Sequence, residues 1–176
     1  MAYLQSLCSM HLKQFITFFL ICATLTACSQ PNATKKEAKV IGISDGDTYE
    51  ALLPDKTTLK IRMEGIDAPE KGMPFYQVAK NYLSQLCFGR NVRIEKLSTD
   101  RYGRTIARTY LSGQEKEVGL MMIEAGLAWH FKKYSSDKEL AAAEIGARKN
   151  KKGLWVDTDC IAPWDYRNAK KKATHH

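Results

Sequence analysis

Acidic and basic side chains gather in four short segments of this chain of 176 residues. Carboxylate oxygens are the ligands that hard cations such as Ca²⁺ and Mg²⁺ prefer, and the planar guanidinium group of arginine matches phosphate oxygens. Each segment alone is also an ordinary turn, because Asp, Gly and Pro favour turns. Together the segments offer ligands for a hard cation and for phosphate. They are DGDT at residues 45–48, IR at 61–62, GIDAPE at 65–70 and DRYGR at 100–104.

Short strands separated by turns are expected to position these segments, because strand-forming runs alternate with Asp-Gly and Pro-Asp pairs. Apolar residues at helical spacing then predict an amphipathic helix that Gly89 ends. Two later stretches predict two more helices. The expected strands lie at residues 40–43, 49–53, 58–66, 91–97 and 105–111, and the expected helices at 75–86, 117–125 and 137–149.

The length of the chain suits one compact domain rather than two. Five strands with a helix after the third is the layout of an oligonucleotide-binding (OB) barrel, a partly open Greek-key fold that binds nucleic acid on one face. The sequence therefore predicts an α+β fold, a five-stranded OB-fold β-barrel with three α-helices. The 27 Lys and Arg residues outnumber the 19 Asp and Glu residues, which suits a polyanionic partner.

The order and spacing of the four segments resemble the staphylococcal nuclease (thermonuclease) family. This family has a DGDT turn, an R-x-x-GIDAPE strand end and a DRYGR loop, followed by GLA and GLW, and the similarity runs from about Lys39 to Arg167. The resemblance implies a phosphodiesterase of the micrococcal nuclease type. Such an enzyme is a Ca²⁺-dependent endonuclease that cuts DNA and RNA, leaves 3′-phosphate ends and acts as a monomer.

The resemblance also implies a metal site. Asp47 and Asp67 would supply the carboxylate ligands of Ca²⁺, and the main-chain carbonyl of Ala68 would complete the protein's share. Water and a phosphate oxygen would fill the remaining positions, because calcium takes six to eight oxygens. Asp45 would lie behind these ligands, and a plain role in the turn is the alternative for this residue.

Three further side chains are implied to act on the phosphate. Glu70 would orient the attacking water, with general-base catalysis left open. Arg62 and Arg104 would grip the scissile phosphate and neutralise the charge that develops there. This set of catalytic and metal-binding side chains is complete in the chain, which favours an active enzyme over the alternative of an inactive OB-fold envelope lipoprotein that only binds nucleic acid.

The family's best-known member has tyrosines where Lys132 and Tyr134 fall, so this chain keeps one of the two tyrosines and has lysine in place of the other. Tyr134 is expected to contact a nucleotide, and Lys132 is expected to offer an ammonium group to phosphate in place of a phenol. His130 nearby is expected to be a packing residue. Trp155 and Trp164 are likewise expected to anchor the packing of the last segments.

The N-terminal part has the layout of a lipoprotein signal peptide. An apolar run at residues 15–27 follows His11 and Lys13 and ends in Leu-Thr-Ala before Cys28. We expect lipidation of Cys28 and export to the cell envelope as an outer-membrane-anchored lipoprotein facing the periplasm or exterior. Ordinary cleavage to a soluble secreted product is the alternative, and Met10 is an alternative start.

Processing at Cys28 would leave Cys87 and Cys160 as the two internal cysteines. In an oxidising compartment these two thiols could form a disulfide. The expected organisation is a signal peptide at residues 1–27, a polar linker at 28–38, a nuclease-like domain at 39–167 and a basic tail at 168–176.

Overall fold

The computed structural model describes residues 34–174, which belong to the compact unit Ala33–His176. The expected signal peptide, the lipidation site Cys28 and the first part of the linker lie outside the described residues. Among the residues described, no helix is long and apolar enough to span a membrane.

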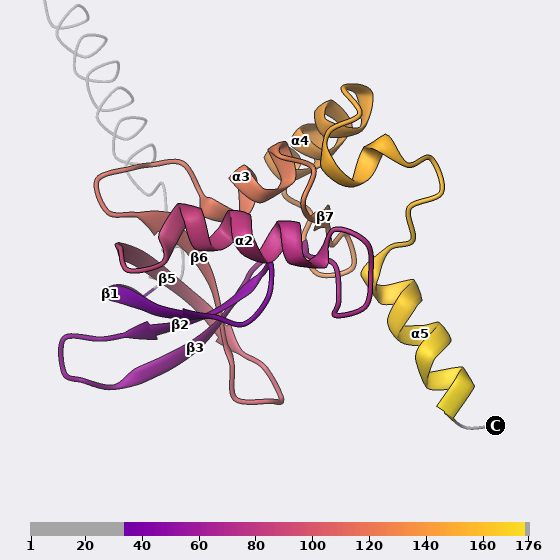
Figure 1. Cartoon of the computed structure of the whole chain (residues 1–176). Coiled ribbons are helices and arrows are strands. Elements are labelled where there is room, and N and C mark those ends of the chain that lie inside the picture. The colour runs from indigo at the N-terminus through magenta and orange to yellow at the C-terminus, as the bar shows by residue number, and fades with distance from the viewer. Residues whose placement is uncertain (1–33, 175–176) are drawn as a thin grey trace, which may run out of the picture. The chain divides into compact units, whose positions relative to one another are not determined.

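Five strands close into a barrel with the order β1-β2-β3-β6-β5 (Figure 1). Neighbouring strands are antiparallel except β3 and β6, which run parallel. Side chains of β6 alternate between buried and half-buried along the whole strand, as a strand between a core and a second face requires. The strands are β1 (Thr34–Ile43), β2 (Thr48–Leu52), β3 (Thr58–Met63), β5 (Asn91–Thr99) and β6 (Thr105–Leu111).

Two buried hydroxyl groups inside this barrel satisfy each other by a hydrogen bond. The hydroxyls of Tyr49 and Thr109 share a hydrogen bond of 2.8 Å, and both side chains are fully buried. The barrel core otherwise consists of aliphatic side chains from all five strands, which pack against helices α2 (Tyr76–Cys87) and α3 (Val118–Glu124). The predicted α+β barrel fold is confirmed.

The expected third strand is interrupted, and the interruption matters for the site. Residues 58–66 do not form one strand, because β3 ends at Met63 and a turn at Gly65 follows with φ of 72°. That left-handed conformation suits glycine. The chain then enters the two-residue strand β4 (Ile66–Asp67), which pairs with β7 (Trp129–His130) outside the barrel. Asp67 therefore lies on a small two-stranded sheet that is separate from the barrel.

A second apolar cluster lies around Trp129 and Trp155, whose rings meet edge to face at 5.1 Å. It is closed by α4 (Lys138–Lys149) and the short 3₁₀ helix η1 (Gly153–Val156). Trp164 also packs against this cluster and stacks on Phe131 with ring centroids 5.2 Å apart. Trp155 and Trp164 are thus packing residues, as the sequence predicts, and Trp164 fixes the start of the last helix.

That last helix, α5 (Pro163–Thr174), is a fourth helix where the sequence analysis expects three. Proline at the first position of a helix loses no hydrogen bond, but the helix has few apolar residues and ends in lysines, so its sequence looks like a tail. The boundaries of the expected domain also change at the other end. Residues 34–38, expected in the linker, form the first half of β1 and pair with β5.

The expected disulfide is not formed, because Cys87 and Cys160 are both free thiols in different parts of the core. Cys87 is fully buried in the barrel cluster, and its thiol donates a hydrogen bond to the Leu83 carbonyl at 3.1 Å. Cys160 packs instead against the cluster of Trp129 and Trp155. Burial raises the pKa of the Cys87 thiol to about 12, which keeps it protonated and unreactive.

Candidate active site

Arg62 joins the two aspartates that the sequence predicts as metal ligands. Its Nη2 lies 3.1 Å from Oδ2 of Asp47 and 2.9 Å from Oδ1 of Asp67. Strand pairing explains the first contact, because Thr48 of β2 is the register partner of Arg62 in β3. The guanidinium is locked from its other side, where Nη1 donates to the carbonyls of Met63 and Ile66 at 2.8 and 2.7 Å.

The DGDT turn is fitted closely around Asp47. Oδ1 of Asp47 accepts a hydrogen bond from the Thr48 hydroxyl at 2.9 Å, and Oδ2 accepts one from the Ala68 amide at 2.7 Å. A Cβ at Gly46 would come within 2.8 Å of the Ala68 side chain and 2.9 Å of Ala79. Only glycine therefore lets the turn approach the GIDAPE segment closely enough for these contacts.

Buried negative charge accumulates at this point of the fold. Burial, and then the neighbouring Asp47, raise the pKa of Asp45 to about 7. Burial also raises the pKa of Asp67, although Arg62 and Arg167 act against that shift. Carboxylates whose pKa values are raised beside two arginines gain from a further cation. The all-oxygen donor set fits Ca²⁺ better than a transition metal.

Side chains alone would not enclose such an ion. Within residues 34–174, no group of three or more His, Cys, Asp or Glu side chains converges in the manner of a metal site. A bound Ca²⁺ would therefore depend on Asp47 and Asp67 together with main-chain, water and substrate oxygens. The sequence predicts the same set: two aspartates, the main-chain carbonyl of Ala68, water and a phosphate oxygen.

Glu70 lies at the open edge of the cluster and is reached by an arginine that the sequence analysis did not select. Arg167 of α5 donates from Nη1 to Glu70 Oε1 at 2.6 Å and to Asp67 Oδ1 at 3.2 Å. Its Nη2 donates to Asp67 Oδ2 at 2.7 Å. The sequence places Arg167 at the end of a closing segment, and no local pattern connects it to carboxylates about a hundred positions earlier.

Arg104 is not bonded to the carboxylate cluster, and it directly precedes β6, the strand that pairs with the strand of Arg62. Its Nε pairs with Oδ2 of Asp100 at 2.8 Å within the DRYGR loop. Arg104 lies two positions before Ile106, which is the parallel register partner of Arg62. Both Nη groups of Arg104 make no hydrogen bond to another described residue, so they are available to a phosphate.

Lys132 and Tyr134 lie apart from the carboxylates among the described contacts. Lys132 Nζ pairs with Oε2 of the buried Glu144 on α4 at 3.2 Å. Tyr134 is 68% exposed and touches Phe131 edge to face at 4.8 Å. His130 is buried, and neither ring nitrogen has a hydrogen-bond partner among the described residues, so the expected packing role stays a prediction.

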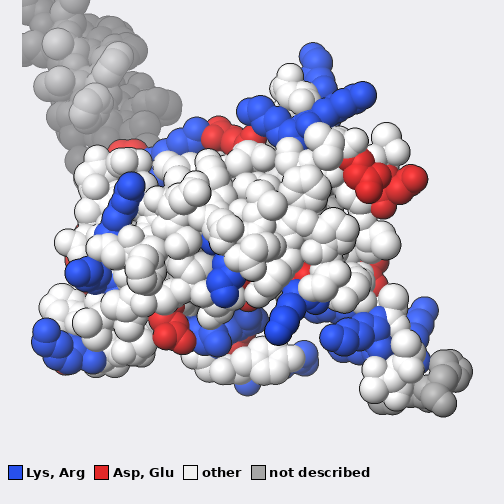
Figure 2. Space-filling model, viewed as in Figure 1, with Lys and Arg blue, Asp and Glu red and all other residues white. Residues whose placement is uncertain are grey.

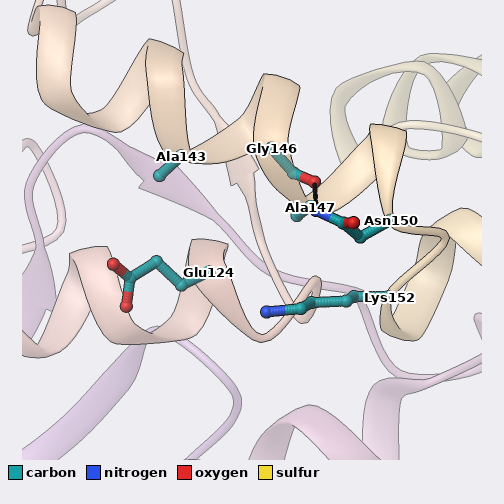
Figure 3. Close-up of a pocket in the computed structure, with 6 residues that line it drawn as sticks. All are labelled: Glu124, Ala143, Gly146, Ala147, Asn150 and Lys152. Carbon is teal, nitrogen blue, oxygen red and sulfur yellow. Dashed lines mark hydrogen bonds between the residues drawn. The ribbon is translucent and has the colours of Figure 1, made fainter.

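Basic side chains are present on the surface of the described residues. Figure 2 shows Lys and Arg side chains mainly around the edge of the face in view, with Asp and Glu among them, and the lysines near the end of α5 are exposed. A hollow of about 370 Å³ lies elsewhere, between α3 and α4, with Glu124 and Lys152 at its edge (Figure 3). None of its lining residues belongs to the carboxylate and arginine cluster.

Comparison with known proteins identifies the family of the chain. The family model described as staphylococcal nuclease homologue matches residues 60–157. An uncharacterized endonuclease of Haemophilus influenzae is 38% identical over 155 residues, which cover 88% of this chain and 84% of that protein. The micrococcal nuclease of Shigella flexneri is 33% identical over 162 residues, covering 87% and 92% respectively. The chain belongs to the staphylococcal nuclease family.

Proposed function

We propose that this protein is a calcium-dependent endonuclease that hydrolyses phosphodiester bonds of DNA and RNA and leaves 3′-phosphate ends. Nuclease activity itself is supported by relatives named as endonuclease and micrococcal nuclease. The observation that carries the proposal is the bridge from Arg62 to Asp47 and Asp67, with the carboxylate of Glu70 at its edge. It combines oxygen ligands for a hard cation with a guanidinium for phosphate.

Asp47, Asp67 and the Ala68 carbonyl would hold Ca²⁺, which when bound polarises a phosphate oxygen as a Lewis acid. The side chain of Glu70 is 41% exposed, so its carboxylate can accept a hydrogen bond from the attacking water and orient it. Arg62 is held rigidly beside the metal ligands, and the free Nη groups of Arg104 face no competing acceptor among the described residues. Two fixed guanidiniums can stabilise the charge that builds on the phosphate oxygens.

The test is cleavage of double-stranded DNA, single-stranded DNA and RNA by the purified mature protein, with Ca²⁺ and with excess chelator. We expect cleavage of all three with Ca²⁺ and none in chelator, and product ends that need a phosphatase before they can prime a polymerase. Undiminished cleavage in chelator would contradict the calcium requirement. Product ends that prime without phosphatase would contradict the proposed position of the cut.

We further propose that the protein is exported and anchored through lipid on Cys28, and that it acts as a monomer. The apolar run followed by Leu-Thr-Ala-Cys at residues 25–28 supports the anchor. Cells given a labelled fatty acid should label the wild-type protein but not Cys28→Ser. Labelling of both, or of neither, would contradict the anchor, and a dimer in analytical ultracentrifugation of the mature protein would contradict the monomer.

A further inference from the structure

Glu70 depends on one side chain for its orientation. The carboxylate is exposed to solvent at the edge of the site, and its hydrogen bond of 2.6 Å to Arg167 is the one that its side chain makes within residues 34–174. An exposed glutamate without such a partner would sample several rotamers, since its side chain carries much rotational freedom. The position of this carboxylate is therefore set by Arg167.

Arg167 is itself fixed in two ways. Its two Nη groups hold both oxygens of Asp67, a forked arrangement that specifies geometry as well as charge. Its helix is anchored by the stacking of Trp164 on Phe131. Phe131 directly follows β7, and β7 pairs with β4, which carries Asp67. The elements that carry Arg167 and Asp67 are thus connected to each other through Phe131 and the β4–β7 pair.

A second contact of α5 reaches the loop that carries Glu70. Gly72 has φ of 97°, and a Cβ there would lie 2.9 Å from the hydroxyl of Tyr166. Tyr166 and Arg167 are adjacent, so neighbouring residues of α5 lie against the loop at Gly72 and hold its Glu70. The last helix therefore faces the active-site loop and does more than close the domain.

We propose that Arg167 is a positioning residue that holds the carboxylate of Glu70 beside Asp67 in the orientation that binds the attacking water. This inference rests on the proposed nuclease function. The guanidinium also carries a cost for the metal site, because a positive charge on Asp67 opposes the binding of a cation to the same carboxylate. Positioning and calcium binding should therefore respond in opposite directions when Arg167 is changed.

The experiment measures kcat, KM and the calcium dissociation constant of the full mature protein and its variants. Arg167→Ala should lower kcat about 10- to 100-fold at saturating Ca²⁺, as expected when a reacting group is misplaced by about 1 Å, and leave KM within about twofold. The same variant should bind Ca²⁺ more tightly than the wild type in a direct titration without substrate. Added guanidinium should restore part of its kcat.

Two controls separate positioning from charge and from general damage. Arg167→Lys keeps the charge but loses the planar fork, so its calcium affinity should stay near that of the wild type while kcat falls. Asn168→Ala changes an exposed neighbour on the same helix and should alter neither quantity. If Arg167→Ala does not fold, the lysine variant still gives the decisive comparison of kcat with calcium affinity.

Several outcomes would overturn the inference. Wild-type kcat in Arg167→Ala and Arg167→Lys would mean that Glu70 needs no partner, and faster cleavage would mean that Arg167 blocks the site. Weaker calcium binding in Arg167→Ala would mean that the contact only supports the fold. If the wild type does not cleave, the proposed function fails by itself. The carboxyl ¹³C resonance of Glu70 still tests the contact, and no shift in Arg167→Lys would refute it.

Discussion

Two clusters of arginines and carboxylates occur in the described residues, and they differ in how closely the arginines pair with the negative charges. In the first, Arg62 and Arg167 hold Asp47, Asp67 and Glu70 through contacts of 2.6 to 3.2 Å. In the second, Arg108 alone faces three carboxylates at 3.2 to 4.0 Å. The three are Glu64, Glu117 and Asp137.

The second cluster leaves hydrogen-bonding groups unsatisfied. Glu64 Oε2, Glu117 Oε1 and Arg108 Nε are buried without a hydrogen bond among the described residues. Burial raises the pKa of Glu117 to about 7 and also raises the pKa of Glu64. Negative charge in the first cluster is thus balanced by two closely paired arginines and, as we expect, by a metal, whereas the single arginine of the second leaves Glu117 with a raised pKa. We propose that the first cluster carries the chemistry, and we expect the second to make the stability of the fold depend on pH.

The largest effect we expect is a loss of kcat when Arg104, the second proposed phosphate-binding arginine, is changed. Arg104→Lys keeps the charge but loses the fork, so it should lower kcat by about 10² to 10³, the usual result of removing a preorganised charge-stabilising donor. Calcium affinity and thermal stability should change little, because Arg104 contacts none of the expected ligands. The measurement is steady-state cleavage at saturating Ca²⁺. Cleavage at the wild-type rate would contradict the assignment of Arg104 to the scissile phosphate.

The second cluster should instead govern the dependence of stability on pH. The pKa of Glu117 is about 7 in the folded protein, against 4.5 for a free glutamate. As pH rises from 4.5 to 7, the unfolded chain releases this proton first, so the free energy of unfolding falls over that window.

Glu117→Gln cannot ionise, and it should reduce the loss of stability between pH 5 and pH 8 by about 1 to 3 kcal/mol. Denaturant unfolding of the wild type and the variant at both pH values gives this difference. The contributions of Glu64, Asp137 and Arg108 are present in both proteins and largely cancel. The same pH dependence in both proteins would show that Glu117 is already ionised at pH 5.

The resemblance to the nuclease family predicts Asp47, Arg62, Asp67 and Glu70 as one site, and the contact between Asp47 and Arg62 also follows from local structure. Asp47 and Arg62 stand at the ends of two strands that pair in the expected meander, and Thr48 opposite Arg62 brings them together. Glycines mark the positions where the chain must turn tightly. The strand-forming residues at 105–111 likewise predict β6, and the structure then shows side chains that alternate between buried and half-buried along it.

What the sequence does not predict depends on tertiary contacts. The pairing of β4 with β7 involves two residues on each side, too few to give a periodic pattern. The reach of Arg167 to Glu70 joins positions 97 apart. The predicted disulfide is wrong for the same reason. Neither the spacing of the two cysteines nor an oxidising compartment indicates which apolar cluster each cysteine joins. Single sequences report local periodicity and composition, whereas these features require the packed chain.

The smallest expected effect tests whether Lys132 belongs to substrate binding, as the family comparison suggests, or to the fold. Its ammonium group already pairs with Glu144, and the lysine side chain is 68% exposed. Glu144 is buried, but Arg148 remains as its second partner at 3.2 Å, so the loss of the exposed ammonium should cost no more than an exposed ion pair, about 0 to 1 kcal/mol. Lys132→Ala should therefore lower stability by less than about 1 kcal/mol and raise KM for DNA no more than about threefold, the scale of one remote phosphate contact. A rise above tenfold would show that Lys132 leaves Glu144 for the substrate.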